Sequence, residues 1–211
     1  MSLIKYNDRS IKNLTTTPAA VTGNSPGALV HIKTLTASSS GTLSFVHGSN
    51  GVVLDSTYPI YKFEFINIHP SSNGSKFNFN LSVDSGSNYN VSKTSTYINA
   101  YHTESDNSSG LSYNTGGDLA NGTADQNMFR GVGAANDECI DGNMNLYNPS
   151  STTFVKHFII RTSVTSSDPG AADTFVAGYG NTTSAVNSVK FLFDTGNIDA
   201  GKIKLYGIKD A

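Results

Sequence analysis

With 211 residues, a formal net charge of −2 and only 14% charged residues, the chain offers no large basic surface for nucleic acid. Hydrophobic residues make up 37% of it, below the usual globular range, whereas Asn, Ser and Thr make up about a third, a composition typical of thin β-sheets joined by many turns. No apolar run is long enough for membrane insertion, no signal-peptide core begins the chain, and the single cysteine, Cys139, favours synthesis in a reducing cytoplasm.

Residues 1 to 27 are predicted to form an extended N-terminal arm. This stretch is polar, and its turn residues leave only four isolated apolar anchors, which are Ile4, Tyr6, Ile11 and Leu14. Such a segment cannot bury enough apolar surface to fold by itself. We therefore expect the arm to attach the protein to a neighbouring chain through these four side chains.

Residues 28 to 211 are predicted to form one all-β domain. Short strand-like runs separated by turn residues recur along the chain, and helical periodicity never persists over a full window of about 11 residues. Besides a pair of runs between residues 60 and 83, the expected strands are 29–36, 41–47, 95–101, 142–148, 154–162, 174–179, 188–193 and 202–206. This pattern predicts an antiparallel β-sandwich, jelly-roll-like in its organisation.

The stretch 60–83 contains the most regular alternation. Its apolar side chains fall on every second residue in two runs, Tyr61, Phe63 and Phe65 and then Phe77, Phe79, Leu81 and Val83. Alternate side chains of a strand point to opposite faces, so each run has one face in a core. A turn at 69–74 joins the runs, and we expect them to pair as an antiparallel hairpin.

The other face of the first run is also partly apolar, because Ile60, Ile66 and Ile68 alternate with the core residues. A face open to water would not need three isoleucines. We therefore expect this face to be covered by the arm, by a loop or by a neighbouring subunit, and we count the three isoleucines as assembly residues.

The segment 102–136 is the part richest in Gly, Asn, Ser and Asp, and we expect it to hold short strands or a functional loop. Four tyrosines, Tyr97, Tyr101, Tyr113 and Tyr147, could form a platform that stacks against a sugar if they reach the surface together. Packing in a core or at its rim is the commoner use of each. Tyr101 and Tyr113 are the candidates for contact with a receptor.

Motifs that suggest an enzyme have simpler explanations. The G-x-S-x-G match at 23–27 lacks the preceding strand and following helix of a nucleophile elbow. Asp84-Ser85-Gly86 and Asp194-Thr195-Gly196 resemble the paired motifs of aspartic proteases. Both also fit tight turns after strands, which is the interpretation we favour. No catalytic residue is predicted.

No cofactor or metal site is predicted either. Asp137, Glu138 and Asp141 form an acidic group around Cys139, but their spacing is not that of an EF-hand, and solvated turn carboxylates are the simpler interpretation. The five histidines are scattered and form no zinc-binding pair.

Several strings of the chain resemble virion structural proteins of marine tailed phages, a group that includes appendage, decoration and fibre-tip proteins. They are LVHIKTLTASSSGTLSF at 29–45, LDSTY at 54–58, VDSGSNYN at 83–90, LYNPSSTTFVKHF at 146–158 and NIDAGKIKLYGI at 197–208. The resemblance implies a β-sandwich, homotrimeric and exposed on a capsid or tail, without enzymatic activity. It supplies no binding or catalytic residues.

Phage fibres carry a long shaft before the tip, whereas only 27 residues precede the sandwich here. This departure favours a capsid decoration protein or a short appendage over a complete fibre. The leading hypothesis is therefore a non-enzymatic virion subunit that binds other virion proteins and itself. The alternative is a phage module that binds a carbohydrate or another host receptor.

Overall fold

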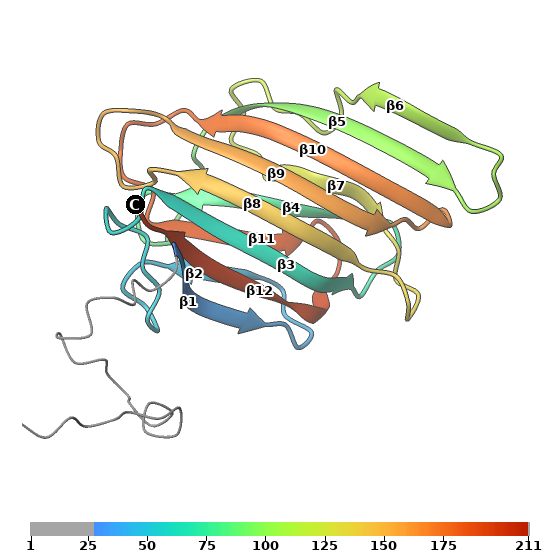
Figure 1. The fold of residues 1–211 in the computed structure, drawn as a ribbon, viewed down its shortest axis with the longest axis horizontal. Coiled ribbons are helices and arrows are strands. Elements are labelled where there is room, and N and C mark those ends of the chain that lie inside the picture. The colour runs from blue at the N-terminus through green and yellow to red at the C-terminus, as the bar shows by residue number, and fades with distance from the viewer. Residues whose placement is uncertain (1–27, 211) are drawn as a thin grey trace, which may run out of the picture.

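The computed structural model describes residues 28–210 as an all-β protein without an α-helix in that range (Figure 1). Its strands are Leu29–Thr36 (β1), Leu43–Val46 (β2), Ile60–Pro70 (β3), Ser75–Ser82 (β4), Lys93–Thr103 (β5), Ser109–Tyr113 (β6), Gln126–Val132 (β7), Ile140–Tyr147 (β8), Lys156–Thr165 (β9), Gly170–Gly180 (β10), Ser188–Phe193 (β11) and Ile198–Ile208 (β12). The predicted arm, with Ile4, Tyr6, Ile11 and Leu14, lies outside the described residues.

The strands form two antiparallel sheets that pack face to face. The large sheet has the order β1-β12-β3-β8-β9-β10-β5-β6, and the small sheet has the order β2-β11-β4-β7. Eight of the strands, β1, β2, β3, β4, β7, β8, β11 and β12, follow the two-sheet order of a jelly roll. The predicted antiparallel, jelly-roll-like sandwich is thus confirmed.

Two hairpins are inserted into this jelly roll, β5–β6 after β4 and β9–β10 after β8. Both join the large sheet beyond β8, so that the sheet continues as β9-β10-β5-β6 while the small sheet keeps its four strands (Figure 1). We call these four strands the extension. The segment 102–136 therefore contains the end of β5, all of β6 and all of β7, in agreement with the expected short strands.

The predicted hairpin at 60–83 is wrong in its pairing. β3 pairs with β12 and β8 in the large sheet, whereas β4 pairs with β11 and β7 in the small sheet. The turn between them crosses from one sheet to the other. Alternation predicts which side chains face the core, but it fits an arch between two sheets as well as a hairpin within one.

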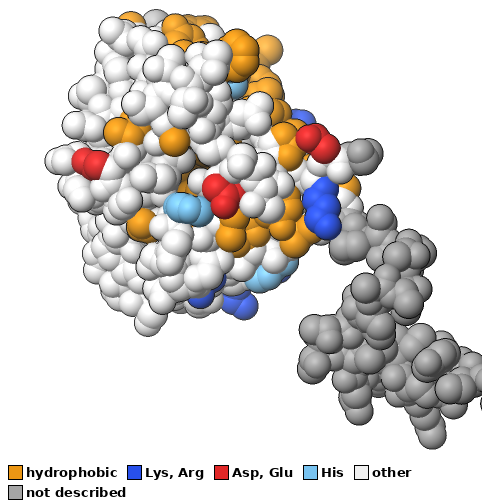
Figure 2. Space-filling model, turned by 90° about the vertical axis from the view of Figure 1, so that its left-hand side faces the viewer, with side chains coloured by type: hydrophobic (Ala, Val, Ile, Leu, Met, Phe, Trp, Pro, Cys, Tyr) orange, Lys and Arg blue, Asp and Glu red, His pale blue; other side chains and the backbone are white. Residues whose placement is uncertain are grey.

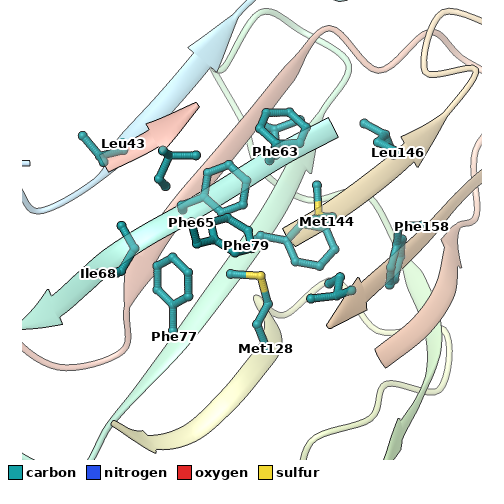
Figure 3. Packing of buried hydrophobic residues seen from close by; sticks show 14 of the residues in the cluster. Leu43, Phe63, Phe65, Ile68, Phe77, Phe79, Met128, Met144, Leu146 and Phe158 are labelled. Carbon is teal, nitrogen blue, oxygen red and sulfur yellow. The ribbon is translucent and has the colours of Figure 1, made fainter. Parts of the chain in front are cut away.

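The predicted core faces of the two runs are confirmed except at Val83, and they meet across the sandwich. Phe65 of β3 and Phe77 of β4 pack edge to face, with ring centroids 5.4 Å apart (Figure 3). Phe191 of β11 lies among them and contacts a larger set of rings, those of Phe45, Phe63, Phe65 and Phe77. Val83 follows the end of β4 and is exposed.

The prediction that Ile68 lies on the outer face of the first run is also wrong. Asn67 has a φ of 50°, and the pairing register of β3 with β8 shifts between Phe65 and Ile68. An extra residue at such a bulge turns the following side chains to the opposite face. Ile68 is consequently in the core, whereas Ile60 and Ile66 remain half-buried on the outer face.

Candidate interaction surface on the large sheet

The outer face of the extension carries a row of large apolar side chains. Ile98 of β5 lies opposite Tyr113 of β6 on one side and opposite Phe175 of β10 on the other. Directly paired residues of antiparallel strands project their side chains from the same face. The three side chains therefore lie next to one another, and the structure leaves all of them exposed.

Two further residues enlarge this row. Leu111 of β6 and Ile159 of β9 also point outward, and we call Ile98, Leu111, Tyr113, Ile159 and Phe175 the apolar stripe. Their exposed fractions lie between 38% and 76%, which is high for side chains of this size. Figure 2, an end-on view, shows hydrophobic side chains collected along the side occupied by the outer face of the large sheet, while the opposite side shows few.

An ion pair lies next to the stripe. Arg161 of β9 is the cross-strand partner of Phe175, and its guanidinium donates to both carboxylate oxygens of Asp173, over 3.2 and 2.8 Å. The carboxylate raises the pKa of Arg161. An apolar area with a charged border of this kind is typical of surfaces that bind another protein.

A shallow depression adjoins the stripe on the same face. It has a volume of about 700 Å³ and a mostly apolar lining that includes Tyr147, His157, Ile159 and Tyr179. The rings of His157 and Tyr179 lie 5.8 Å apart at an angle of 57°. Thr94 and Thr96 add hydroxyl groups to the lining. Rings beside hydroxyls are the groups that a sugar contacts with its C–H faces and its hydroxyls.

The two predicted receptor residues are not brought together. Tyr113 faces outward with the stripe, and its hydroxyl donates to Asp118, which raises the pKa of Tyr113. Tyr101 points to the other face of the sheet, where its ring covers Gly110. There it lines a separate groove of about 880 Å³, whose charged residues include Arg130.

The other two tyrosines of the suggested platform also have different positions. Tyr97 is buried in the core, and Tyr147 lines the depression beside His157. Sequence reasoning missed Leu111, whose neighbours in the chain are Gly110 and Ser112, and it also missed Ile98, Ile159 and Phe175. For the last three, the available signal was that each stands next to another apolar residue in its strand, as expected where both faces of a sheet are apolar.

The two protease-like motifs lie apart. β4 and β11 run antiparallel, and Asp84 follows the end of β4 while Asp194 follows the end of β11, so the two carboxylates lie at opposite ends of this strand pair. Each of the two carboxylates stabilises the turn in which it lies. Asp84 accepts hydrogen bonds from the Ser82 hydroxyl and from Asn88, which lower its pKa to about 2. Asp194 accepts one from the Lys76 amide at 2.8 Å.

Two of the three carboxylates near Cys139, those of Glu138 and Asp141, accept hydrogen bonds from within the chain. Asp141 accepts from the Asn67 amide at 2.8 Å and from the Cys139 thiol at 3.4 Å, and Glu138 accepts from the Ala135 amide at 2.6 Å. Burial and the neighbouring Asp141 raise the pKa of Cys139 to about 11, so the thiol stays protonated. Within residues 28–210, no three side chains of the metal-binding types lie close enough to hold an ion.

Comparison with known proteins adds no relative: no family model, no curated protein and no solved structure matches the chain. In the part of the chain that the structure describes, no helix is long and apolar enough to cross a membrane.

Proposed function

We propose that the chain is a non-enzymatic structural subunit of a bacteriophage particle, a capsid decoration protein or a subunit of a short head or tail appendage. It is held to other virion proteins by its N-terminal arm and to copies of itself, as a homotrimer, by the outer face of the large sheet. The observation that carries this proposal is the apolar stripe on the extension.

The stripe supports an assembly role for an energetic reason. Removing apolar surface from water lowers the free energy by about 25 cal/mol for each Å². Burial of the five exposed side chains of the stripe against another chain is therefore favourable. The edge strand of the extension, β6, supports an assembly role as well. β6 is the last strand of the large sheet, and one edge of its backbone has no strand partner among residues 28–210. Such an edge can pair with a strand of another chain.

The oligomeric state of the purified protein tests the role of the stripe. The double variant Ile98→Thr/Phe175→Thr should be monomeric at concentrations where the wild-type chain is a trimer, as measured by light scattering during size-exclusion chromatography. Phe154→Thr is the matched control, because Phe154 is an exposed phenylalanine outside the stripe. A wild-type chain that stays monomeric would contradict the trimer, and unchanged assembly of the double variant would contradict the role of the stripe.

The arm requires a separate test. A variant without residues 2–27 should fold and should trimerise, but it should no longer join particles in a co-assembly experiment. Normal incorporation of this variant would show that the anchor lies elsewhere. The single variants Ile60→Thr and Ile66→Thr test whether the outer face of β3 belongs to the same contact.

A second candidate function is binding of a carbohydrate on the host surface. The depression with Tyr147, His157 and Tyr179 favours it, since it combines rings with nearby hydroxyls. A glycan array with the wild-type protein and with Tyr179→Ala separates the two candidates. Binding that depends on Tyr179 supports a receptor module, whereas the absence of binding to any glycan supports a purely structural subunit.

A further inference from the structure

Lys93 is a fully buried lysine at the start of β5. Its ammonium group donates to the side-chain oxygen Oδ1 of Asn80 at 2.6 Å and to the backbone oxygen of Val91 at 2.8 Å. Asn80 is also buried and belongs to β4 of the small sheet. The contact therefore joins β5 of the large sheet to β4 of the small sheet. The proposed assembly function does not explain why a lysine is buried there.

Both the oxygen and the nitrogen of the Asn80 side-chain amide form hydrogen bonds. Besides Lys93, the backbone N–H of Leu81 donates to Oδ1, at 2.9 Å. The amide nitrogen Nδ2 donates to Asp125 Oδ1 at 2.8 Å and to the Thr123 carbonyl oxygen at 3.2 Å. The carbonyl oxygen thus faces donors, and the amide nitrogen faces a carboxylate that can exchange a proton with it.

Lys93 is also prepared to act as a nucleophile. Burial lowers its pKa to about 8, assisted by the nearby charge of Lys190 and opposed by that of Asp125. In an appreciable fraction of the molecules the Lys93 amine is therefore neutral near physiological pH, with a free electron pair on nitrogen. The amide carbon lies within about 4 Å of Nζ, because a C=O bond adds only about 1.2 Å to the contact with Oδ1.

We propose that Lys93 and Asn80 react to form an intramolecular amide cross-link. The electron pair of Nζ attacks Cγ of Asn80, and a C–N bond forms while the negative charge on Oδ1 is stabilised by the Leu81 N–H. Once both nitrogens are bonded to Cγ, Asp125, which already contacts Nδ2, lies within reach of Nζ, and it carries the proton released by Nζ to Nδ2. The bond between Cγ and Nδ2 then breaks, and ammonia leaves. No oxidant, reductant or cofactor takes part, and Asp125 ends in its starting state.

The cross-link would connect β4 of the small sheet with β5 of the extension. It would close a covalent ring over the connection between β4 and β5. Unfolding would then leave the two strands tied together, which restricts the unfolded chain as a disulfide does. Such a bond, unlike a disulfide, forms in a reducing compartment.

Tryptic peptide mapping of the denatured full-length protein provides a direct test. Trypsin cleaves after Lys76, Lys93 and Arg130, and an unmodified chain gives the separate peptides 77–93 and 94–130. Trypsin does not cleave at a lysine whose amine is in an amide bond. The cross-linked chain should therefore give one peptide, 77–130, lighter by one ammonia than its sequence requires. Recovery of both separate peptides in full yield overturns the proposal.

The position of the lost ammonia matters, because an Asn-Gly pair such as Asn121-Gly122 can lose ammonia by forming a succinimide. That reaction leaves cleavage at Lys93 intact, so only the missed cleavage together with the mass loss supports the cross-link. Lys93→Arg is the matched control, and it should give both peptides at full mass.

Asp125→Asn tests the proton transfer separately. Asp125 is partly exposed, so this variant should fold, and its amide can still contact Asn80. A smaller cross-linked fraction than in the wild-type protein supports the role of Asp125. An equal fraction after the same time of expression would overturn that role.

Discussion

The eight jelly-roll strands and the four-stranded extension differ in how they use their outer surface. In the jelly roll, the outer face of the large sheet carries charged residues such as Lys62 and Glu64 of β3, which form an ion pair at 2.9 Å. In the extension, the corresponding positions hold Ile98, Phe175 and Tyr113. Both sets of residues belong to the large sheet, so the difference lies in the side chains.

We infer from this difference that the jelly roll stabilises the fold, whereas the outer face of the extension serves contact with another chain. The jelly roll has two layers that cover each other, and most of its large apolar residues are buried in the core between them (Figure 3). The extension continues one layer only, and β6 is exposed along its whole length. The apolar residues on its outer face therefore contribute less to folding of the single chain and remain available for contact with another chain. The largest effects on stability are expected in the first region, and the largest effects on assembly in the second.

Phe191→Ala is expected to have the largest effect on stability. The ring of Phe191 packs against four other phenylalanines at the centre of the sandwich. Removing a buried phenylalanine side chain costs about 3–5 kcal/mol. Phe175→Ala, on the exposed face of β10, is the control and should cost less than about 1 kcal/mol. Urea unfolding measures both, and equal losses would contradict the proposed division between the regions.

Gly201→Ala is expected to have the next largest effect. Gly201 has a φ of 110°, and a Cβ atom there would clash with the backbone oxygen of Asn67 in the bulge of β3. We expect a loss of about 1–3 kcal/mol from the strained backbone conformation together with this clash.

Gly48→Ala separates the two causes of that loss. Gly48 has a φ of 78°, but a Cβ atom there meets no other atom. Its replacement should cost about 1 kcal/mol, from the backbone conformation alone. If both variants lose the same stability in urea unfolding, the close approach at the bulge is unimportant.

Asp84→Asn should change the acid sensitivity of the jelly roll. Hydrogen bonds from Ser82 and Asn88 lower the pKa of Asp84 in the folded chain to about 2, below its ordinary value near 4. The contribution of this carboxylate is therefore fully present above about pH 4 and is lost as the pH falls toward about 2. The variant should show a flatter dependence of unfolding free energy on pH in that range. Parallel curves for the two proteins would contradict this role.

The sequence allows the core faces to be predicted but not the partners of the strands. Tyr61, Phe63 and Phe65 alternate regularly, and periodicity alone placed them in the core correctly. The pairing of β3 with β12 and β8 depends on distant segments, so local alternation carries no information about it. The bulge at Asn67 then reverses the faces within one strand and places Ile68 in the core, and no pattern of apolar residues marks that extra residue.

The candidate surface was harder to predict for a related reason. A strand with one buried face explains Tyr97 and Val176 well, and it leaves Ile98 and Phe175 as apparent exceptions. They become meaningful only when the register places them side by side with Tyr113. Tyr101 and Tyr113 show the converse, since both were predicted to contact a receptor and the sheet places them on opposite faces.

The variant Leu111→Thr/Tyr113→Thr in β6 should have the smallest effect on stability. Both side chains are exposed, and threonine retains the β propensity of the strand, so we expect a change in unfolding free energy of less than about 0.5 kcal/mol. The same change removes two of the five stripe residues and should shift the oligomer toward monomer. Urea unfolding under conditions where both proteins are monomeric, together with light scattering at higher concentration, measures the two effects separately. A large loss of stability in the monomer would mean that the stripe packs within its own chain, and the division between a closed jelly roll and an interacting extension would then fail.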